Sequence, residues 1–221
     1  TTRDAVLDEQ VLFYTDALES EQIARAEYSF APTEGRDWQI SVESAFNSLD
    51  IENRLFELDG GALTQSVLDD PSVRVEEARR EVTLTHSRQL SQALHVQVSL
   101  GAESSHISQS GATDVSREFV RPKGFIKASY TVDDSFKIRL ESDRRVGQLR
   151  FFDFISSIDV SDETETSSNA DLVPLQYWNH VAVFEKDFGQ GNTALLRLFY
   201  EDITDLVDRI PIGDTGDAVG N

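Results

Sequence analysis

The chain has 221 residues, and its 40 acidic side chains against 20 basic ones give a formal net charge of −20 at pH 7. A protein that coats DNA or RNA neutralises phosphates with Lys and Arg, so this charge excludes nucleic acid as a partner. Cysteine is absent, which excludes a disulfide framework, a cysteine-based zinc site and a thiol nucleophile. The apolar runs are far shorter than the about 20 residues of a membrane-spanning helix, so a helical membrane protein is excluded and a membrane β-barrel is not.

Apolar and polar residues alternate with period two along most of the chain, which predicts β-strands. The clearest case is 94–103, where Leu94, Val96, Val98 and Leu100 share one face and polar residues fill the other. In chain order, the predicted strands lie near 24–30, 38–46, 76–87, 94–103, 118–130, 136–143, 175–186 and 193–203. The fold class is therefore all-β, with about eight strands.

The links between these strands alternate in length. Short polar links fall at 31–37, 88–93, 131–135 and 187–192, and long ones at about 47–75, 104–117 and 144–174. Tight turns at one end and long loops at the other are typical of an outer-membrane barrel. We therefore predict an antiparallel up-and-down meander, part of a transmembrane β-barrel, with all four tight turns at one end.

Aromatic residues favour the same interpretation. Tyr28, Phe30 and Trp38 flank the first tight turn, as expected for an aromatic girdle at a membrane interface. Leu196, Leu198 and Tyr200 are then predicted to face lipid, together with Val98, Ala128 and Ile138.

Three segments carry a resemblance to a known family. Residues 172–221, which include the string RIPIG, resemble the barrel of TonB-dependent outer-membrane receptors, and RPKGFIKASY (121–130) and FKIRLESDRRVGQLRFFDF (136–154) look like the preceding strands. The resemblance implies uptake of a solute across the bacterial outer membrane, with outer-membrane lipid and lipopolysaccharide around the barrel. The plug domain, the short box that contacts the TonB-type energising protein and the terminal aromatic of the family have no counterpart in the sequence. We therefore expect residues 1–221 to be an interior portion of one barrel domain, which meets the energising protein only through parts outside it.

Signatures of enzymes are missing from the sequence. It has no Gly-x-Ser-x-Gly elbow, no His-Glu-x-x-His pair and no phosphate-binding Gly-x-x-x-x-Gly-Lys. The four histidines, His86, His95, His106 and His180, are far apart in the sequence. We predict no enzyme activity and no cofactor.

Two concentrations of charge are candidate contacts for the solute. The link 153–173 is acidic, without Lys or Arg, and holds Asp159, Asp162, Glu163 and Glu165. Its carboxylates are hard ligands that suit a cation such as calcium, but their spacing does not match the twelve-residue calcium loop, so a solvated external loop is the simpler interpretation. We expect this link to be extended, mobile and external, to lack a packed core of its own and to serve in solute capture.

The second concentration is cationic: Lys137, Arg139, Arg144, Arg145 and Arg150. Strand alternation places Lys137 and Arg139 in the lumen, and the three other residues near the external end, where an anionic solute or a lipopolysaccharide phosphate can meet them. Alternatively, the cations balance Glu141, Asp143 and other carboxylates in a wet lumen.

Two further functions stay open at this point. One is a self-contained small outer-membrane barrel with a structural or adhesive role, and the other is a soluble β-barrel that binds an apolar ligand inside. Alternation alone does not distinguish them, because it does not say which face of the sheet meets lipid.

Overall fold

The computed structural model describes residues 11–59, 61–67, 71–111, 114–151, 157–159, 164–167, 172–212 and 216–220. Regular structure in these residues is β-strand throughout. None of the described residues form a helix long and apolar enough to cross a membrane.

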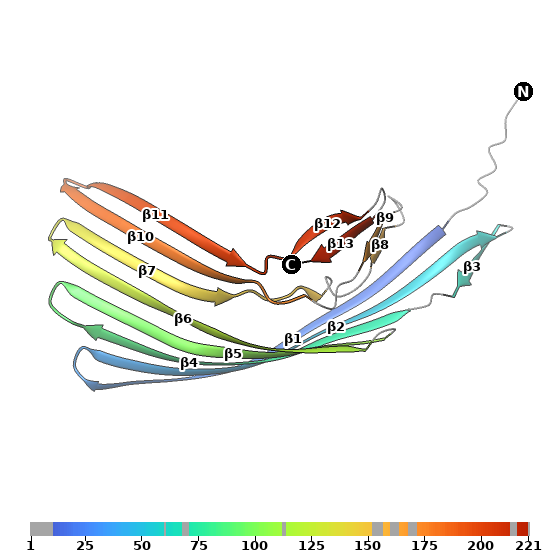
Figure 1. The fold of residues 1–221 in the computed structure, drawn as a ribbon, viewed down its shortest axis with the longest axis horizontal. Helices are drawn as coiled ribbons and strands as arrows, with labels where there is room; N and C mark the ends of the chain where they lie inside the picture. The colour runs from blue at the N-terminus through green and yellow to red at the C-terminus, as the bar shows by residue number, and fades with distance from the viewer. Residues whose placement is uncertain are drawn as a thin grey trace, which may run out of the picture.

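Eight long strands form one antiparallel sheet. They are β1 (Val11–Thr33), β2 (Arg36–Asp59), β4 (Ser72–Gln89), β5 (Leu94–Ser110), β6 (Val115–Asp133), β7 (Phe136–Val146), β10 (Gln176–Gly189) and β11 (Asn192–Thr204). Each pairs with the next in this order, and the short β3 (Ala62–Ser66) pairs with the end of β2. The all-β meander is confirmed. Figure 1 shows that the sheet curls without closing, with β1 and β11 at its two edges.

The four tight turns lie at the same end of the sheet, as predicted (Figure 1, left). Gly35 and Gly191 adopt φ of 72° and 82°, the left-handed region that these turns require. In the β6–β7 turn, the Ser135 hydroxyl and amide donate to the Asp133 carboxylate at 2.6 and 2.8 Å. These hydrogen bonds lower the pKa of the Asp133 carboxyl because they stabilise its charged form.

Two of the predicted long links are wrong. Strands β2, β3 and β4 occupy most of 47–75, and β5 and β6 occupy most of 104–117. The strands extend far beyond the positions at which their alternation breaks in the sequence. The reason is a reversal of polarity along each strand, visible in the two faces of the sheet.

Near the tight turns, the outer face is apolar and exposed. Registered rows cross the sheet there, such as Leu198, Ala182, Leu140, Ala128 and Val96. Leu100 is 70% exposed, whereas the polar residues Ser99 and Glu103, which point to the other face, are 3% and 6% exposed. This difference identifies the crowded face as the inner side of the curl, because side chains converge on the concave side.

The prediction that this apolar set shares one outward face is confirmed. Leu196 is in register with Phe184, Ile138 and Tyr130, and Tyr200 with His180, Ser142, Ile126 and Val98, so all of them lie on the apolar outer face.

Farther from the tight turns, the pattern reverses. The outer face becomes polar. Arg74 forms ion pairs there with Asp50 at 3.2 Å and with Glu76 at 2.7 Å. The inner face becomes apolar and forms the buried core, made of Leu49, Ile51, Val73, Val75, Ile107, Phe119, Leu149, Phe151 and Leu172. Strands β2, β4, β5 and β6 thus have one half with an apolar outer face, and another half with a polar outer face and apolar side chains packed inside.

The acidic link differs from expectation at its described positions. Two short strands within the link, β8 (Ser157–Asp159) and β9 (Thr164–Ser167), pair with each other. Strand β9 also pairs with β13 (Gly216–Gly220), and β13 pairs with β12 (Asp208–Ile212). Leu172, at the end of the link, is fully buried. This contact joins the end of the link to the core of the sheet and does not give the link a core of its own.

Candidate functional site

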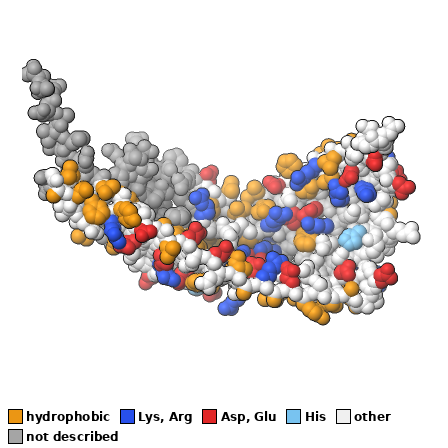
Figure 2. Space-filling view, turned by 180° about the vertical axis from the view of Figure 1, so that it is seen from behind, with side chains coloured by type: hydrophobic (Ala, Val, Ile, Leu, Met, Phe, Trp, Pro, Cys, Tyr) orange, Lys and Arg blue, Asp and Glu red, His pale blue; other side chains and the backbone are white. Residues whose placement is uncertain are grey.

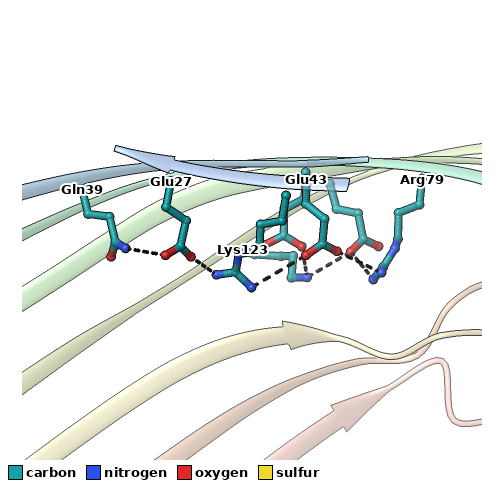
Figure 3. A network of polar contacts seen from close by, with 8 residues as sticks. Glu27, Gln39, Glu43, Arg79 and Lys123 are labelled. Atoms are coloured by element: carbon teal, nitrogen blue, oxygen red, sulfur yellow. Dashed lines mark hydrogen bonds and ion pairs between the residues drawn. The ribbon is translucent and has the colours of Figure 1, made fainter. Parts of the chain in front are cut away.

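A network of charged side chains crosses the inner face between the polar and apolar halves. It contains Arg25 and Glu27 from β1, Gln39 and Glu43 from β2, Arg79 and Glu81 from β4, Glu103 from β5 and Lys123 from β6. We call these residues the wall network. Figure 3 shows that its labelled members point away from β1 and β2 into the curl, toward the ribbons of the later strands.

Strand register brings these residues together. Glu43 pairs with Glu81, which pairs with Glu103, so three carboxylates would form one row on the same face. Cations from the adjacent rows separate them. Arg79 contacts Glu43 at 3.1 Å and Glu103 at 3.7 Å, and Lys123 Nζ donates to Glu81 at 2.5 Å and to Glu103 at 2.9 Å.

The β1 end of the wall network is more exposed. Arg25 contacts Glu27 at 2.5 Å and Glu43 at 3.7 Å, and Gln39 donates to Glu27 at 3.1 Å. The Arg25 side chain is 56% exposed, whereas those of Arg79 and Glu103 are 14% and 8% exposed. The ion pairs at the β4–β5 end are thus the better shielded from solvent, and the stronger for it.

The wall network has three cations and four carboxylates, a net charge of −1. It presents both hydrogen-bond donors and acceptors to the hollow of the curl, a polar lining typical of the interior of a membrane barrel. Cationic and acidic side chains are also interspersed along the rest of the curved body (Figure 2). The arrangement suits recognition of a polar solute or packing of a polar domain, without covalent chemistry.

The predicted cations do not form a single site. Arg139 contacts Glu185 at 3.0 Å on the inner face, and Lys137 lies on the same face in register with Glu185. Arg145 is paired with Asp143, a buried carboxylate that also accepts from Asn179 at 3.0 Å. For Arg139 and Arg145, the structure agrees with charge balance by neighbouring carboxylates.

Arg144 and Arg150 lie elsewhere. Arg144 faces outward, with its guanidinium carbon 5.9 Å from the centre of the Trp178 ring, and donates to Gln176 at 2.7 Å. Arg150 is exposed and borders a groove with Glu19 and Glu21. Of the five, Lys137, Arg139 and Arg145 are therefore on the inner face of the sheet, Arg144 is on its outer face, and Arg150 lies after β7 beside the groove.

Of the predicted acidic residues, Asp159 and Glu165 lie in β8 and β9, where Glu165 pairs with Ile158. Asp162 and Glu163 lie outside the described residues. The proposed role of these four carboxylates in solute capture stays a prediction.

The histidines occupy four separate environments. His86 stacks on Trp38 with ring centres 4.1 Å apart, His95 hydrogen-bonds Ser87 at 2.8 Å, His106 lies 3.4 Å from Glu118, and His180 stacks between Trp178 and Tyr200. Within the described ranges, no three His, Cys, Asp or Glu side chains gather as metal ligands.

The sequence interpretation missed the wall network. Alternation already assigned Glu43 and Glu103 to the polar face of their strands, but their mutual proximity depends on register across β2, β4 and β5. A lone Lys123 in RPKGFIKASY gives no local sign that it bridges two carboxylates from other strands.

An apolar outer face, a polar inner face and an open antiparallel sheet define the wall of a membrane-type β-barrel. Solved structures with this fold include the alcaligin outer-membrane receptor FauA from Bordetella pertussis, with a TM-score of 0.55 and 13% identity over 97% of this chain and 35% of that chain. The ferric citrate transporter FecA gives a TM-score of 0.59 and 13% identity over 89% of this chain and 29% of that chain. The hemophore receptor HasR from Serratia marcescens gives a TM-score of 0.62 and 9% identity over 96% of this chain and 38% of that chain.

These structures are TonB-dependent outer-membrane receptors, and the chain has the fold of part of their barrel, a half-barrel. It spans about a third of the length of each. No protein-family model matches the sequence, and no curated protein matches it.

Proposed function

We propose that this chain is part of the wall of a TonB-dependent receptor in the bacterial outer membrane, and that the receptor takes up a solute across that membrane. The reversal of polarity along the strands is the observation that carries the proposal. A β-strand with an apolar outer face near its tight turns and a polar outer face beyond them suits a barrel that projects from the bilayer into water. The neighbours in structure include an alcaligin receptor, a copper transporter and a hemophore receptor, which supports a role in uptake.

The proposal assigns a role to each surface. The apolar outer face near the tight turns contacts outer-membrane lipid. Arg144, which lies beside Trp178 at the edge of this face, contacts lipopolysaccharide phosphate. The wall network lines the path or holds the domain that fills the barrel. Contact with the energising protein takes place through parts outside this chain.

A pair of neighbouring substitutions tests the membrane orientation. Leu196→Arg places a charge on the outer face and is expected to destabilise the barrel by about 2–4 kcal/mol near the bilayer midplane. Arg197→Leu changes the inner face, in register with Val183, and is expected to be nearly neutral. The free energy of unfolding is measured by denaturant titration after refolding into lipid vesicles. The opposite ranking would mean that the apolar set faces inward, and a soluble barrel would replace the membrane barrel.

Uptake itself is tested in cells. The gene that encodes this chain is deleted, and growth is compared on iron bound to siderophores, on heme and on other scarce nutrients, with and without the energising protein. A nutrient requirement that appears on deletion and equally on loss of the energising protein supports the proposal. Fractionation of the protein away from the outer membrane would contradict it.

A further inference from the structure

A groove of about 570 Å³ lies on the inner face, between β1, β2 and the segment that follows β7. Its lining includes Glu19, Glu21, Asn47, Glu77 and residues 148–151. We call it the Glu77 groove. It adjoins the wall network, since Glu77 and Arg79 are on the same face of β4, two residues apart.

Glu77 is a buried carboxylate whose hydrogen-bond donors are neutral. It is 6% exposed, and it accepts from Asn47 Nδ2 at 3.1 Å and from Ser105 Oγ at 2.6 Å. No described cation lies within ion-pair distance of it, because Arg79 is engaged by Glu43 and Glu103. Burial of a carboxylate without a counter-cation costs free energy, so a cation bound at this place would be favoured.

Asn47 provides an independent sign of a missing donor. It is 8% exposed, and its Oδ1 is buried without a hydrogen-bond partner. Because its Nδ2 is engaged by Glu77, the orientation of the amide is fixed and Oδ1 is left to accept. A buried acceptor of this kind is normally satisfied. The two residues that carry these unsatisfied features, Glu77 and Asn47, both line the same groove.

The chemistry selects the class of ligand. A group that carries positive charge and only donates hydrogen bonds satisfies Glu77 and Asn47 together, and both ammonium and guanidinium groups do so. A bare metal ion fits less well, because the described residues contain no cluster of three His, Cys, Asp or Glu side chains. Glu19 and Glu21 add two further carboxylates, and Arg150 one cation, so the groove has a net charge of −2.

We propose that the Glu77 groove binds the ammonium or guanidinium group of an organic cation. This inference deepens the proposed function and rests on it, because the bound molecule is taken to be the solute of the receptor. The groove would hold the cationic group between Glu77 and Asn47, with Glu19 and Glu21 attracting it to the entrance.

Binding of radiolabelled cadaverine, a diamine, to the full chain in outer-membrane vesicles tests this proposal. Saturable binding is expected, and the neutral isostere 1,5-pentanediol is expected not to displace it. Glu77→Gln keeps the size of the side chain but removes its charge and replaces one acceptor oxygen with an NH2 donor, and should weaken binding by about tenfold or more. Glu76→Gln is the matched control, since Glu76 is the adjacent residue on the opposite face and is paired with Arg74. It should change binding by less than about twofold.

Three results would overturn the proposal: no saturable binding, equal effects of the two substitutions, or displacement by Ca²⁺ at equal concentration, which would make the groove a metal site. Protease resistance of each variant in the vesicles reports assembly, and the two competitors test the wild-type protein without any variant. If cadaverine binds but deletion of the gene produces no nutrient requirement, the proposed function fails and the groove stands. If the requirement is found and cadaverine does not bind, only the groove assignment fails.

Discussion

At the scale of single residues, Lys123 bridges two carboxylates from two other strands. Its ammonium joins Glu81 and Glu103, carboxylates that strand register holds on the same face of adjacent strands. Like charges in such positions repel each other. Lys123 offsets this repulsion because it donates a charge-assisted hydrogen bond to each carboxylate. The side chains of Lys123 and Glu103 are 20% and 8% exposed, so solvent screens this bridge less than the surface ion pairs of the chain.

Lys123→Met is therefore expected to destabilise the sheet by about 1–3 kcal/mol, because it leaves two poorly solvated carboxylates without their cation. Lys127→Met is the control, since the Lys127–Glu141 pair at 3.0 Å is 44% and 31% exposed. The control should cost less than about 1 kcal/mol. Denaturant titration of both variants in lipid vesicles gives the comparison. Equal losses would show that water reaches the wall network as freely as it reaches the surface.

At the scale of elements, the strands are longer than their sequence pattern indicates. In β2, the apolar set occupies Trp38, Ile40 and Val42 on the outer face and then Leu49 and Ile51 on the inner face. The change of face shifts the apolar positions from even to odd numbers, so the alternation is interrupted between Val42 and Leu49. The environment of the strand changes there, and its backbone does not.

The features that the sequence predicts well are those that depend on local signals. The eight strands, their order, their tight turns and the outward-facing apolar set depend on short-range alternation and on turn residues, which are local. The wall network and the buried core depend on register between strands and on the return of Leu149, Phe151 and Leu172 to the inner face. Such long-range contacts leave no periodic trace. The acidic character of the link also concealed the apolar residues at its ends.

Leu172 is expected to anchor the link to the sheet. It is fully buried among the apolar residues of β2, β4, β5 and β6, so Leu172→Ala should destabilise the protein by about 2–5 kcal/mol, the range for a large-to-small change in a core. Leu206→Ala is the control, because Leu206 is 57% exposed, and its effect should stay within about 0.5 kcal/mol. Thermal unfolding followed by circular dichroism measures both. A loss no larger for Leu172 than for Leu206 would mean that the link is not held by this contact.

The middle of the link is expected to have a different role from its ends. Excision of residues 159–171 removes β9, the strand beside β13, but spares Leu149, Phe151 and Leu172 in the core. Assembly of the barrel should survive, and solute binding or uptake should fall if the removed carboxylates serve in solute capture. Assembly is followed by heat-modifiable mobility on gels and uptake by growth. Failure to assemble without a separate effect on uptake would assign the segment a structural role.

At the scale of the whole molecule, the sheet has two open edges. Strands β1 and β11 each have one neighbour in the described sheet, β2 and β10. An unpaired edge within a bilayer leaves backbone N–H and C=O groups without partners, which membrane barrels avoid by closure. An eight-stranded barrel closed by β1 and β11 would satisfy these groups, whereas a larger barrel would satisfy them with further strands. The open curl agrees with the larger barrel.

The absence of cysteine allows a direct test of closure, because engineered cysteines are then the only thiols in the chain. Tyr28 and Ile40 are registered partners in β1 and β2, so the pair Tyr28→Cys with Ile40→Cys should form a disulfide on oxidation in membranes. Cysteines at Tyr28 of β1 and at Leu196, Leu198 or Tyr200 of β11 should stay reduced, because a disulfide needs Cα atoms within about 7 Å and the two edges are apart. Testing three positions of β11 covers the registers that two adjacent strands would adopt near this level. Efficient crosslinking of any of them would mean that β1 and β11 are neighbours in the membrane. The chain would then be a complete small barrel, and its polar lumen would be too narrow for the solute path proposed above.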